Sequence, residues 1–151
     1  YEHLTMERAA SVQYFSMYLW FQERDLYGFS SYFLGESQCE MEHAKKFADY
    51  LIARGQNVKL KDLSEPVQTW DSIENLVSYS FNMEADLTSS IQQLYSISER
   101  MSDTRTNVFL DPILESQIKS EDDFAHILGK VKFADNQPSA ILLLDNELKE
   151  K

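Results

Sequence analysis

The sequence has 151 residues, enough for one domain with a sizeable core, and its few glycines (4) and prolines (3) favour long helices over a turn-rich β fold. Its formal net charge of −11 disfavours nucleic acid and anionic lipid as partners and attracts cations, although solubility alone would also account for the charge. No apolar run approaches the roughly 20 residues of a membrane-spanning helix, so no membrane partner is expected.

The first two predicted helices form a hairpin. The spacing of apolar residues predicts one helix over residues 2–27 and a second over residues 29–54. Gly28 is expected to make the turn between them, and Gly55 is expected to end the second helix. We expect the following side chains to point inward: Leu4, Tyr14, Met17, Tyr18 and Phe21 in the first helix, and Tyr32, Phe33, Phe47, Tyr50 and Leu51 in the second.

A second hairpin is predicted after a long connection. Its helices cover residues 72–101, capped by Asp71 or Ser72, and residues 104–134. Pro112 must kink the latter helix or mark a late start. The expected inward side chains are Ile73, Val77, Phe81, Leu87, Ile91 and Leu94, followed by Leu110, Leu114, Ile118, Phe124, Leu128 and Val131.

The connections between the helices determine the topology. Short turns make each hairpin antiparallel, whereas the 17 residues 55–71 can stretch to roughly 56 Å and so run the length of a helix of roughly 39 Å. Two hairpins joined by one long crossover form an all-α four-helix bundle, here a single domain over residues 1–151. A short fifth helix over residues 139–150 would have nothing to pack on in an isolated chain, which predicts a large hollow homo-oligomer.

Polar residues on the second helix point to metal chemistry. Glu36, Glu40 and His43 are spaced i, i+4 and i+7, which places them within about 60° of one another on one face. The Glu-x-x-His spacing of Glu40 and His43 lets one helix supply two ligands to one ion. Alone, this pattern is usually a solvated helix face, so its meaning depends on the other helices.

The other helices also carry polar residues in register with their apolar stripes, namely Glu7, Glu84 and Gln117. A buried carboxylate without a partner is costly, and several facing one another would be worse. Cations remove that cost, and carboxylates with one imidazole suit iron. Taken alone, Glu84 is equally well explained as a core carboxylate with hydrogen-bond partners, and Tyr14 as an ordinary core side chain. The presence of inward polar residues on all four helices together predicts a metal centre.

The residues that carry a family resemblance are Glu7-Arg8-Ala9-Ala10-Ser11 with Tyr14, Glu40-Met41-Glu42-His43, Glu84 and Glu115-Ser116-Gln117. Through them essentially the whole sequence resembles the haem-free ferritins that oxidise Fe²⁺ with O₂ and store the ferric product. Two short segments, Asp103-Thr104-Arg105-Thr106 and Asp111-Pro112, are similar to the corresponding segments of ferritins from marine cyanobacteria and algae.

The resemblance implies a ferroxidase centre with two irons per chain. It assigns Glu7 and His43 to the first iron, Glu40 to a bridging position and Glu84 to the second iron. Gln117 would lie beside the second iron, and Tyr14 beside the site, where it either supplies an electron or only packs. The fifth helix would line the four-fold axis of a cage of about 24 subunits.

Some residues depart from the family pattern or leave two readings open. The fourth helix has Gln117 and Ser120 without a matching histidine, which argues against the bacterioferritins. Glu36, with Glu115 as partner, either holds a third iron in transit or only lowers the local potential. Cys39 replaces an acid of many relatives, and a half-buried thiol is expected there.

Three other functions compete with the ferritin reading. A di-iron oxygenase or peroxidase would need an open pocket beside the metals, and bulky inner aromatics argue against one. A non-catalytic cage subunit would lack at least one of the ligands. An iron-free interaction protein leaves the buried acids unexplained. The single cysteine fits a reducing compartment, which predicts a cytoplasmic protein, or a plastid protein if the source is an alga.

Overall fold

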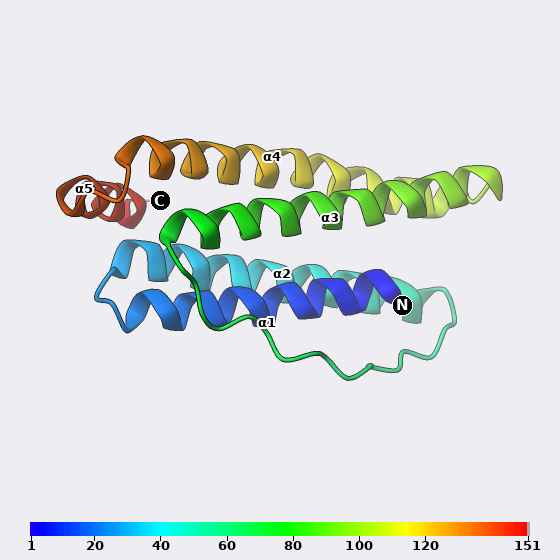
Figure 1. The fold of residues 1–151 in the computed structure, drawn as a ribbon. Coiled ribbons are helices and arrows are strands. Elements are labelled where there is room, and N and C mark those ends of the chain that lie inside the picture. The colour runs from blue at the N-terminus through cyan, green and yellow to red at the C-terminus, as the bar shows by residue number, and fades with distance from the viewer. Residues whose placement is uncertain (151) are drawn as a thin grey trace. The chain divides into compact units, whose positions relative to one another are not determined.

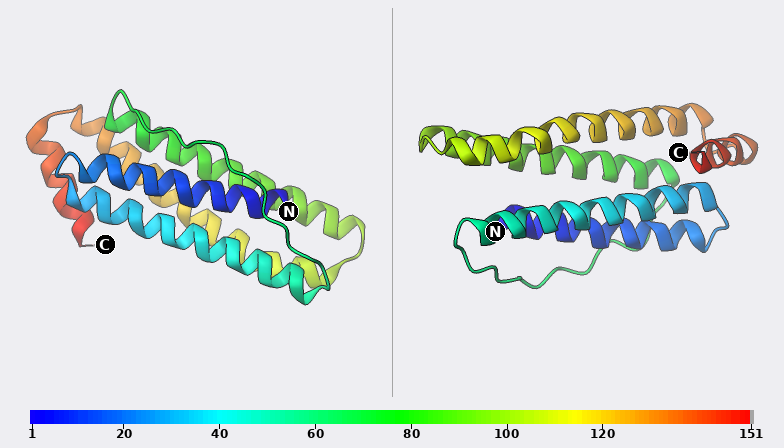
Figure 2. Two further views of the ribbon diagram at one scale, coloured as in Figure 1. Left: turned by 90° about the horizontal axis from the view of Figure 1, so that it is seen from below. Right: turned by 180° about the vertical axis from the view of Figure 1, so that it is seen from behind.

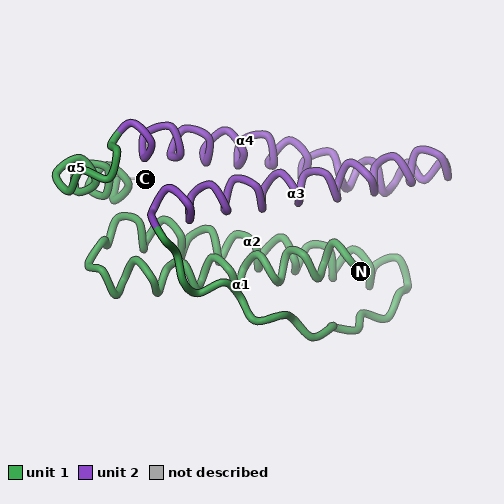
Figure 3. Tube along the Cα trace, viewed as in Figure 1, with its two compact units in different colours: residues 1–71, 134–151 green, residues 72–133 purple. Residues whose placement is uncertain are grey.

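The computed structural model describes residues 1–150, which form five helices and no strand (Figure 1). Figure 3 divides the chain into two compact units, residues 1–71 with the segment from Ala134 onward, and residues 72–133. The expected single domain stays a prediction. Within residues 1–150, none of the helices combines the length and the apolar character that a membrane span requires. The helices are α1 (Glu2–Gln22), α2 (Tyr27–Ala53), α3 (Ile73–Arg100), α4 (Thr104–Ala134) and α5 (Pro138–Lys149).

The turn between α1 and α2 differs from the expected one. The two helices lie side by side and antiparallel in all views (Figures 1 and 2), but α1 ends at Gln22 rather than at residue 27. Asp25 makes the turn with a φ of 60°, a left-handed conformation that a short polar side chain tolerates. The assignment of Gly28 to the turn was therefore wrong, because Gly28 lies in the first turn of α2.

Gly28 is needed for the close approach of α5. A Cβ atom at this position would lie only 1.7 Å from the backbone oxygen of Asp145. The Oδ1 atom of Asp145 accepts a hydrogen bond of 2.8 Å from the Phe29 backbone N–H in the first turn of α2. The expectation that the fifth helix has nothing to pack on in one chain is therefore wrong. α5 buries Ile141, Leu144, Asp145 and Leu148, and it leaves Leu142 and Leu143 exposed.

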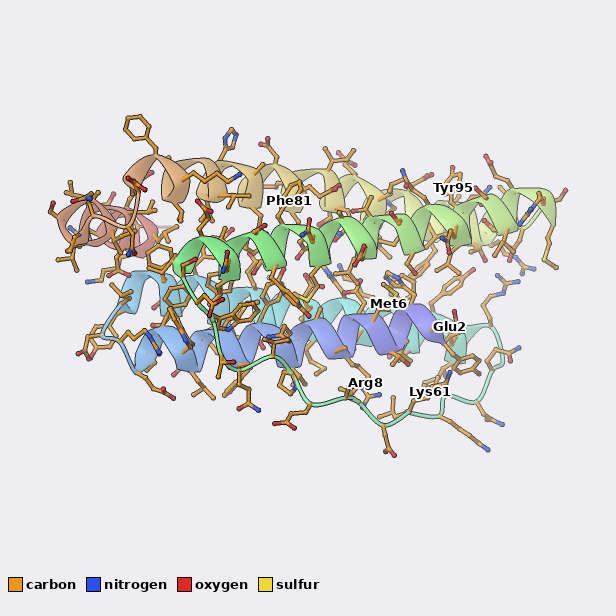
Figure 4. The ribbon with its side chains drawn as sticks, in the orientation of Figure 1. Glu2, Met6, Arg8, Lys61, Phe81 and Tyr95 are labelled. Atoms are coloured by element: carbon orange, nitrogen blue, oxygen red, sulfur yellow. The ribbon has the colours of Figure 1, made fainter. Side chains whose placement is uncertain are left out.

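The long connection is held against α1 by hydrogen bonds. The Gln13 side chain is buried, donates to the Val67 carbonyl at 2.9 Å and accepts from the Val67 N–H at 2.9 Å. The Arg8 guanidinium donates to the Lys61 carbonyl at 2.8 Å, and Figure 4 labels both residues where the connection passes α1. These contacts satisfy backbone groups that a segment without regular structure would otherwise expose.

Local signals at two helix ends were predicted correctly. Gly55 has a φ of +80° and follows the last residues of α2. The Gly55 and Gln56 N–H groups donate back to Ile52 and Leu51, which is the hydrogen-bond pattern of a Schellman motif. Ser72 caps α3, and its hydroxyl accepts from the Asn75 N–H at 3.0 Å.

The unit of residues 72–133 is an antiparallel hairpin of α3 and α4. Ser102 is left-handed (φ 55°), and the Asp103 carboxylate accepts from the N–H of Thr106 in the first turn of α4. α4 continues through Pro112, which lies on an exposed side of the helix. Ile118 is 65% exposed, so its expected inward position was wrong, because Gln117 occupies the buried position instead.

Candidate metal centre

A buried acidic cluster joins α1 and α2. Glu7 of α1 and Glu40 of α2 are fully buried, and the His43 side chain is 17% exposed. The three residues each offer one ligand atom, and these atoms all lie within 4.8 Å of one another. His43 Nδ1 is 3.2 Å from Glu40 Oε2, at hydrogen-bond distance. The same nitrogen is 3.7 Å from Glu7 Oε2, which is within ion-pair reach but too long for a hydrogen bond.

A pair of serines fixes the register of α1 against α2 next to this cluster. The Ser11 hydroxyl donates to the Ser37 carbonyl at 2.7 Å, and the Ser37 hydroxyl donates to the Ser11 carbonyl at 2.8 Å. Both serines are buried. Ser11 lies one turn after Glu7 and Ser37 lies about one turn before Glu40, so the exchange holds the two carboxylates opposite each other.

The charge of Glu7 is stabilised by its neighbours. Burial alone raises the pKa of this carboxyl, but contacts with His3, His43 and Glu40 outweigh it and lower the pKa to about 2. The His3 Nε2 atom lies 2.9 Å from Glu7 Oε1. The other oxygen, Glu7 Oε2, is buried and has no hydrogen-bond partner among residues 1–150.

The donor set fits a cation. An ionised carboxylate oxygen that is buried without a donor is costly, and a metal ion bound to it removes that cost. The three ligand atoms are two carboxylate oxygens and one imidazole nitrogen, a set that suits iron and other divalent transition metals. The arrangement can therefore bind a metal ion and neutralise its charge with two carboxylates.

The second unit carries its own polar network. Glu84 of α3 and Gln117 of α4 are fully buried. The Gln117 Nε2 atom lies 3.0 Å from Glu84 Oε2 and 3.2 Å from Thr88 Oγ1. Thr88 Oγ1 is in turn 3.2 Å from Glu121 Oε2. The Gln117 Oε1 atom is buried without a partner within residues 1–150, which leaves one amide oxygen available on this helix pair.

The remaining predicted site residues differ in exposure. Tyr14 is fully buried, and its ring packs at 5.9 Å from that of Phe33. Glu36 is half-buried, whereas Glu115 is exposed. Glu115 precedes Gln117 by two residues and so points about 200° away from it around the helix. Cys39 is exposed, so the expected half-buried thiol was wrong.

Sequence reasoning missed three residues of these networks. His3 precedes Glu7 by four residues, Thr88 follows Glu84 by four, and Glu121 follows Gln117 by four. The i, i+4 spacing from a predicted ligand is the signal that would have found all three, because it places two side chains on one helix face.

A family model described as the ferritin-like domain matches residues 1–134. The chain belongs to the ferritin family. The fold class expected from the sequence, an all-α ferritin-like four-helix bundle with a short fifth helix, is thereby confirmed.

Known ferritins from several kingdoms are similar over most of the chain. A ferritin of Pacifastacus leniusculus is 27% identical over 99% of this chain and 85% of its own length. The ferritin-1 heavy chain of Schistosoma mansoni is 33% identical over 79% of this chain and 71% of its own length. An open pore ferritin of the archaeon Archaeoglobus fulgidus has a TM-score of 0.96 and 29% identity, covering 99% of this chain and 93% of that one.

Proposed function

We propose that this ferritin oxidises Fe²⁺ with O₂ at a two-iron centre and stores the ferric product inside a cage of identical subunits. The observation that carries the proposal is the buried cluster of Glu7, Glu40 and His43, in which the Oε2 atom of Glu7 has no hydrogen-bond partner among residues 1–150. Family membership favours iron as the metal.

The residues have different roles in this proposal. Glu7 and His43 bind the first iron, and Glu40 binds both. Glu84 binds the second iron, with the Gln117 amide beside it. Carboxylates are hard oxygen ligands that tolerate both Fe²⁺ and Fe³⁺, whereas a neutral amide adds no charge and so holds Fe³⁺ less strongly. An asymmetric second position would let the oxidised iron leave for the mineral.

The reaction is an electron transfer from iron, which is the substrate, to O₂. Two Fe²⁺ ions lose one electron each, and one O₂ molecule takes up both electrons and two protons from the solvent. The protein holds the two ions together and offsets their positive charge with carboxylates. The acidic surface, with a net charge of −11, raises the local concentration of Fe²⁺.

Apolar surface supports assembly with further copies of the chain. Val12, Phe15 and Leu19 are exposed at helical spacing along α1. Leu142 and Leu143 of α5 are 59% and 72% exposed. Exposed apolar residues at helical spacing favour a protein partner over solvent, and copies of the same chain are the partners that a ferritin would use.

Oxygen consumption after the addition of two Fe²⁺ per chain tests the oxidase. The parent should consume O₂ in a fast phase, and His43→Ala should lose that phase because it removes an iron ligand. His126→Ala is the matched control, since His126 is exposed on α4 and its Nε2 atom lies 3.4 Å from the carboxylate of Asp122. Parent-like rates in His43→Ala, with the assembled size unchanged, would refute the assignment.

A further inference from the structure

His3 is a buried polar residue that the proposed reaction does not use. It lies in the first turn of α1 and is only 3% exposed. Burying a polar side chain is costly unless it has hydrogen-bond partners. The Nε2 atom of His3 lies 2.9 Å from Glu7 Oε1, one helical turn further along. An ionised carboxylate can only accept, so Nε2 carries the hydrogen of this bond.

The ring of His3 is also held from the side of α2. Its centroid lies 4.5 Å from that of the Phe47 ring, with an angle of 50° between the ring planes. Phe47 is itself buried on α2, about one turn after His43. A planar ring that is packed against a second ring and bonded at its edge has little freedom, so its N–H points in a fixed direction.

The consequence falls on the two oxygens of Glu7. Oε1 is bonded to His3, whereas Oε2, which has no hydrogen-bond partner within residues 1–150, lies 3.7 Å from His43 Nδ1. We propose that His3 is a positioning residue for the metal centre, which holds Oε1 of Glu7 so that Oε2 is the oxygen offered to a metal ion. This inference rests on the proposed metal centre, because Glu7 matters as a ligand only there.

Without this hydrogen bond the Glu7 carboxylate has two other orientations, and each would change how the metal ion is bound. It could rotate about its last torsion, which is soft in glutamate, and bind the ion through both oxygens. It could also turn towards another donor and leave the ion with fewer ligands. Partners that orient metal ligands typically change metal affinity by about 10–100-fold when they are removed. We expect an effect of this size from His3.

Cobalt binding gives a readout that does not depend on oxidation. Co²⁺ is titrated into the assembled protein, and its visible absorption reports the ligand geometry. His3→Leu should weaken binding by about 10–100-fold and alter the bands, whereas His3→Gln should restore most of the affinity because its amide N–H can donate. His3→Met is a second variant without a donor that still fills the space beside Phe47. His126→Leu, at an exposed site, is the control.

Crystal structures of the Co²⁺-bound parent and variants would show the orientation of the Glu7 carboxylate directly. The parent should have one Glu7 oxygen on the ion, and His3→Met should have both oxygens or neither. Parent-like affinity and spectrum in His3→Leu and His3→Met would overturn the proposal. Equal losses in His3→Gln and His3→Met would also overturn it, since packing against Phe47 would then be the role. If Glu7→Ala and His43→Ala both bind Co²⁺ as tightly as the parent does, the metal centre itself would instead be refuted.

Discussion

Docking of α5 on α2 depends on one buried hydrogen bond, and Asp145→Ala tests it. The first N–H groups of a helix have no partner inside the helix, and Leu26 at the cap of α2 offers no side-chain acceptor. Asp145 supplies the missing acceptor at 2.8 Å from the Phe29 N. Leaving a buried donor unsatisfied costs about 1–3 kcal/mol, and a carboxylate at a helix N-terminus contributes roughly 0.3–1 kcal/mol more.

These terms together place the loss at about 2.5 kcal/mol, which corresponds to roughly 60-fold in the local opening equilibrium. Hydrogen exchange of peptides that cover residues 26–33, measured by mass spectrometry in the assembled protein, should accelerate by about that factor. Asp145→Asn keeps an acceptor oxygen and should lose much less. Asn146→Ala, at the exposed neighbouring position, should not differ from the parent.

Gly28→Ala should have the same effect with Asp145 intact, because its Cβ would lie 1.7 Å from the Asp145 carbonyl oxygen and force α5 away. Gly35→Ala is the matched control in the same helix. Outside its own stretch of helix, a Cβ there would meet no atom of residues 1–150 within 4 Å, so the substitution should stabilise α2 by roughly 0.5–1 kcal/mol. Unchanged exchange near Phe29 in both Asp145→Ala and Gly28→Ala would show that the Asp145 hydrogen bond does not hold α5 on α2.

Further predictions concern the metal centre. Tyr14→Phe keeps the buried packing, so a loss of a transient radical signal or slower oxidation would assign a redox role to Tyr14, and parent-like behaviour would leave it a packing role. Glu36→Ala should leave the first two irons per chain normal and slow later additions in a mineralisation assay, whereas equal slowing of both phases would place Glu36 in the two-iron centre. The pKa of Glu7 is lowered from 4.5 in the unfolded chain to about 2 in the folded protein. Its ionised carboxylate therefore contributes its full stabilisation of the metal-free fold at any pH above 4.5, and this stabilisation is lost as the pH falls towards 2. In Glu7→Gln the free energy of unfolding, measured with urea, should therefore depend less on pH below 4.5 than in the parent. The same pH dependence in both proteins would contradict the lowered pKa of Glu7.

The sequence was sufficient where local signals act alone. Helical spacing, the left-handed Gly55 and the Ser72 cap each depend on a few neighbouring residues, and the structure has them as predicted. The grouping of Glu40 with His43 follows from the same helical geometry. That Glu7 lies opposite them depends on the register of α1 and α2, which the Ser11–Ser37 hydrogen bonds fix.

The errors arose where a distant segment decides the local structure. Gly28 was read as a turn residue, but α5, more than a hundred positions later, is what requires a glycine there. Ile118 was placed inward by its apolar character, but the neighbouring Gln117 is buried because its amide bonds to Glu84. The contact of His3 with Glu7 was also missed, although its i, i+4 spacing from a predicted ligand places both side chains on one helix face.

Anaerobic soaking of crystals with Fe²⁺, with diffraction recorded at the iron absorption edge, tests the two-iron centre directly. We expect two iron positions per chain, the first bound by Glu7 and His43, the second by Glu84, and both by Glu40. Iron found only on the outer surface, or a single ion that does not contact Glu7 and His43, would contradict the proposed two-iron centre.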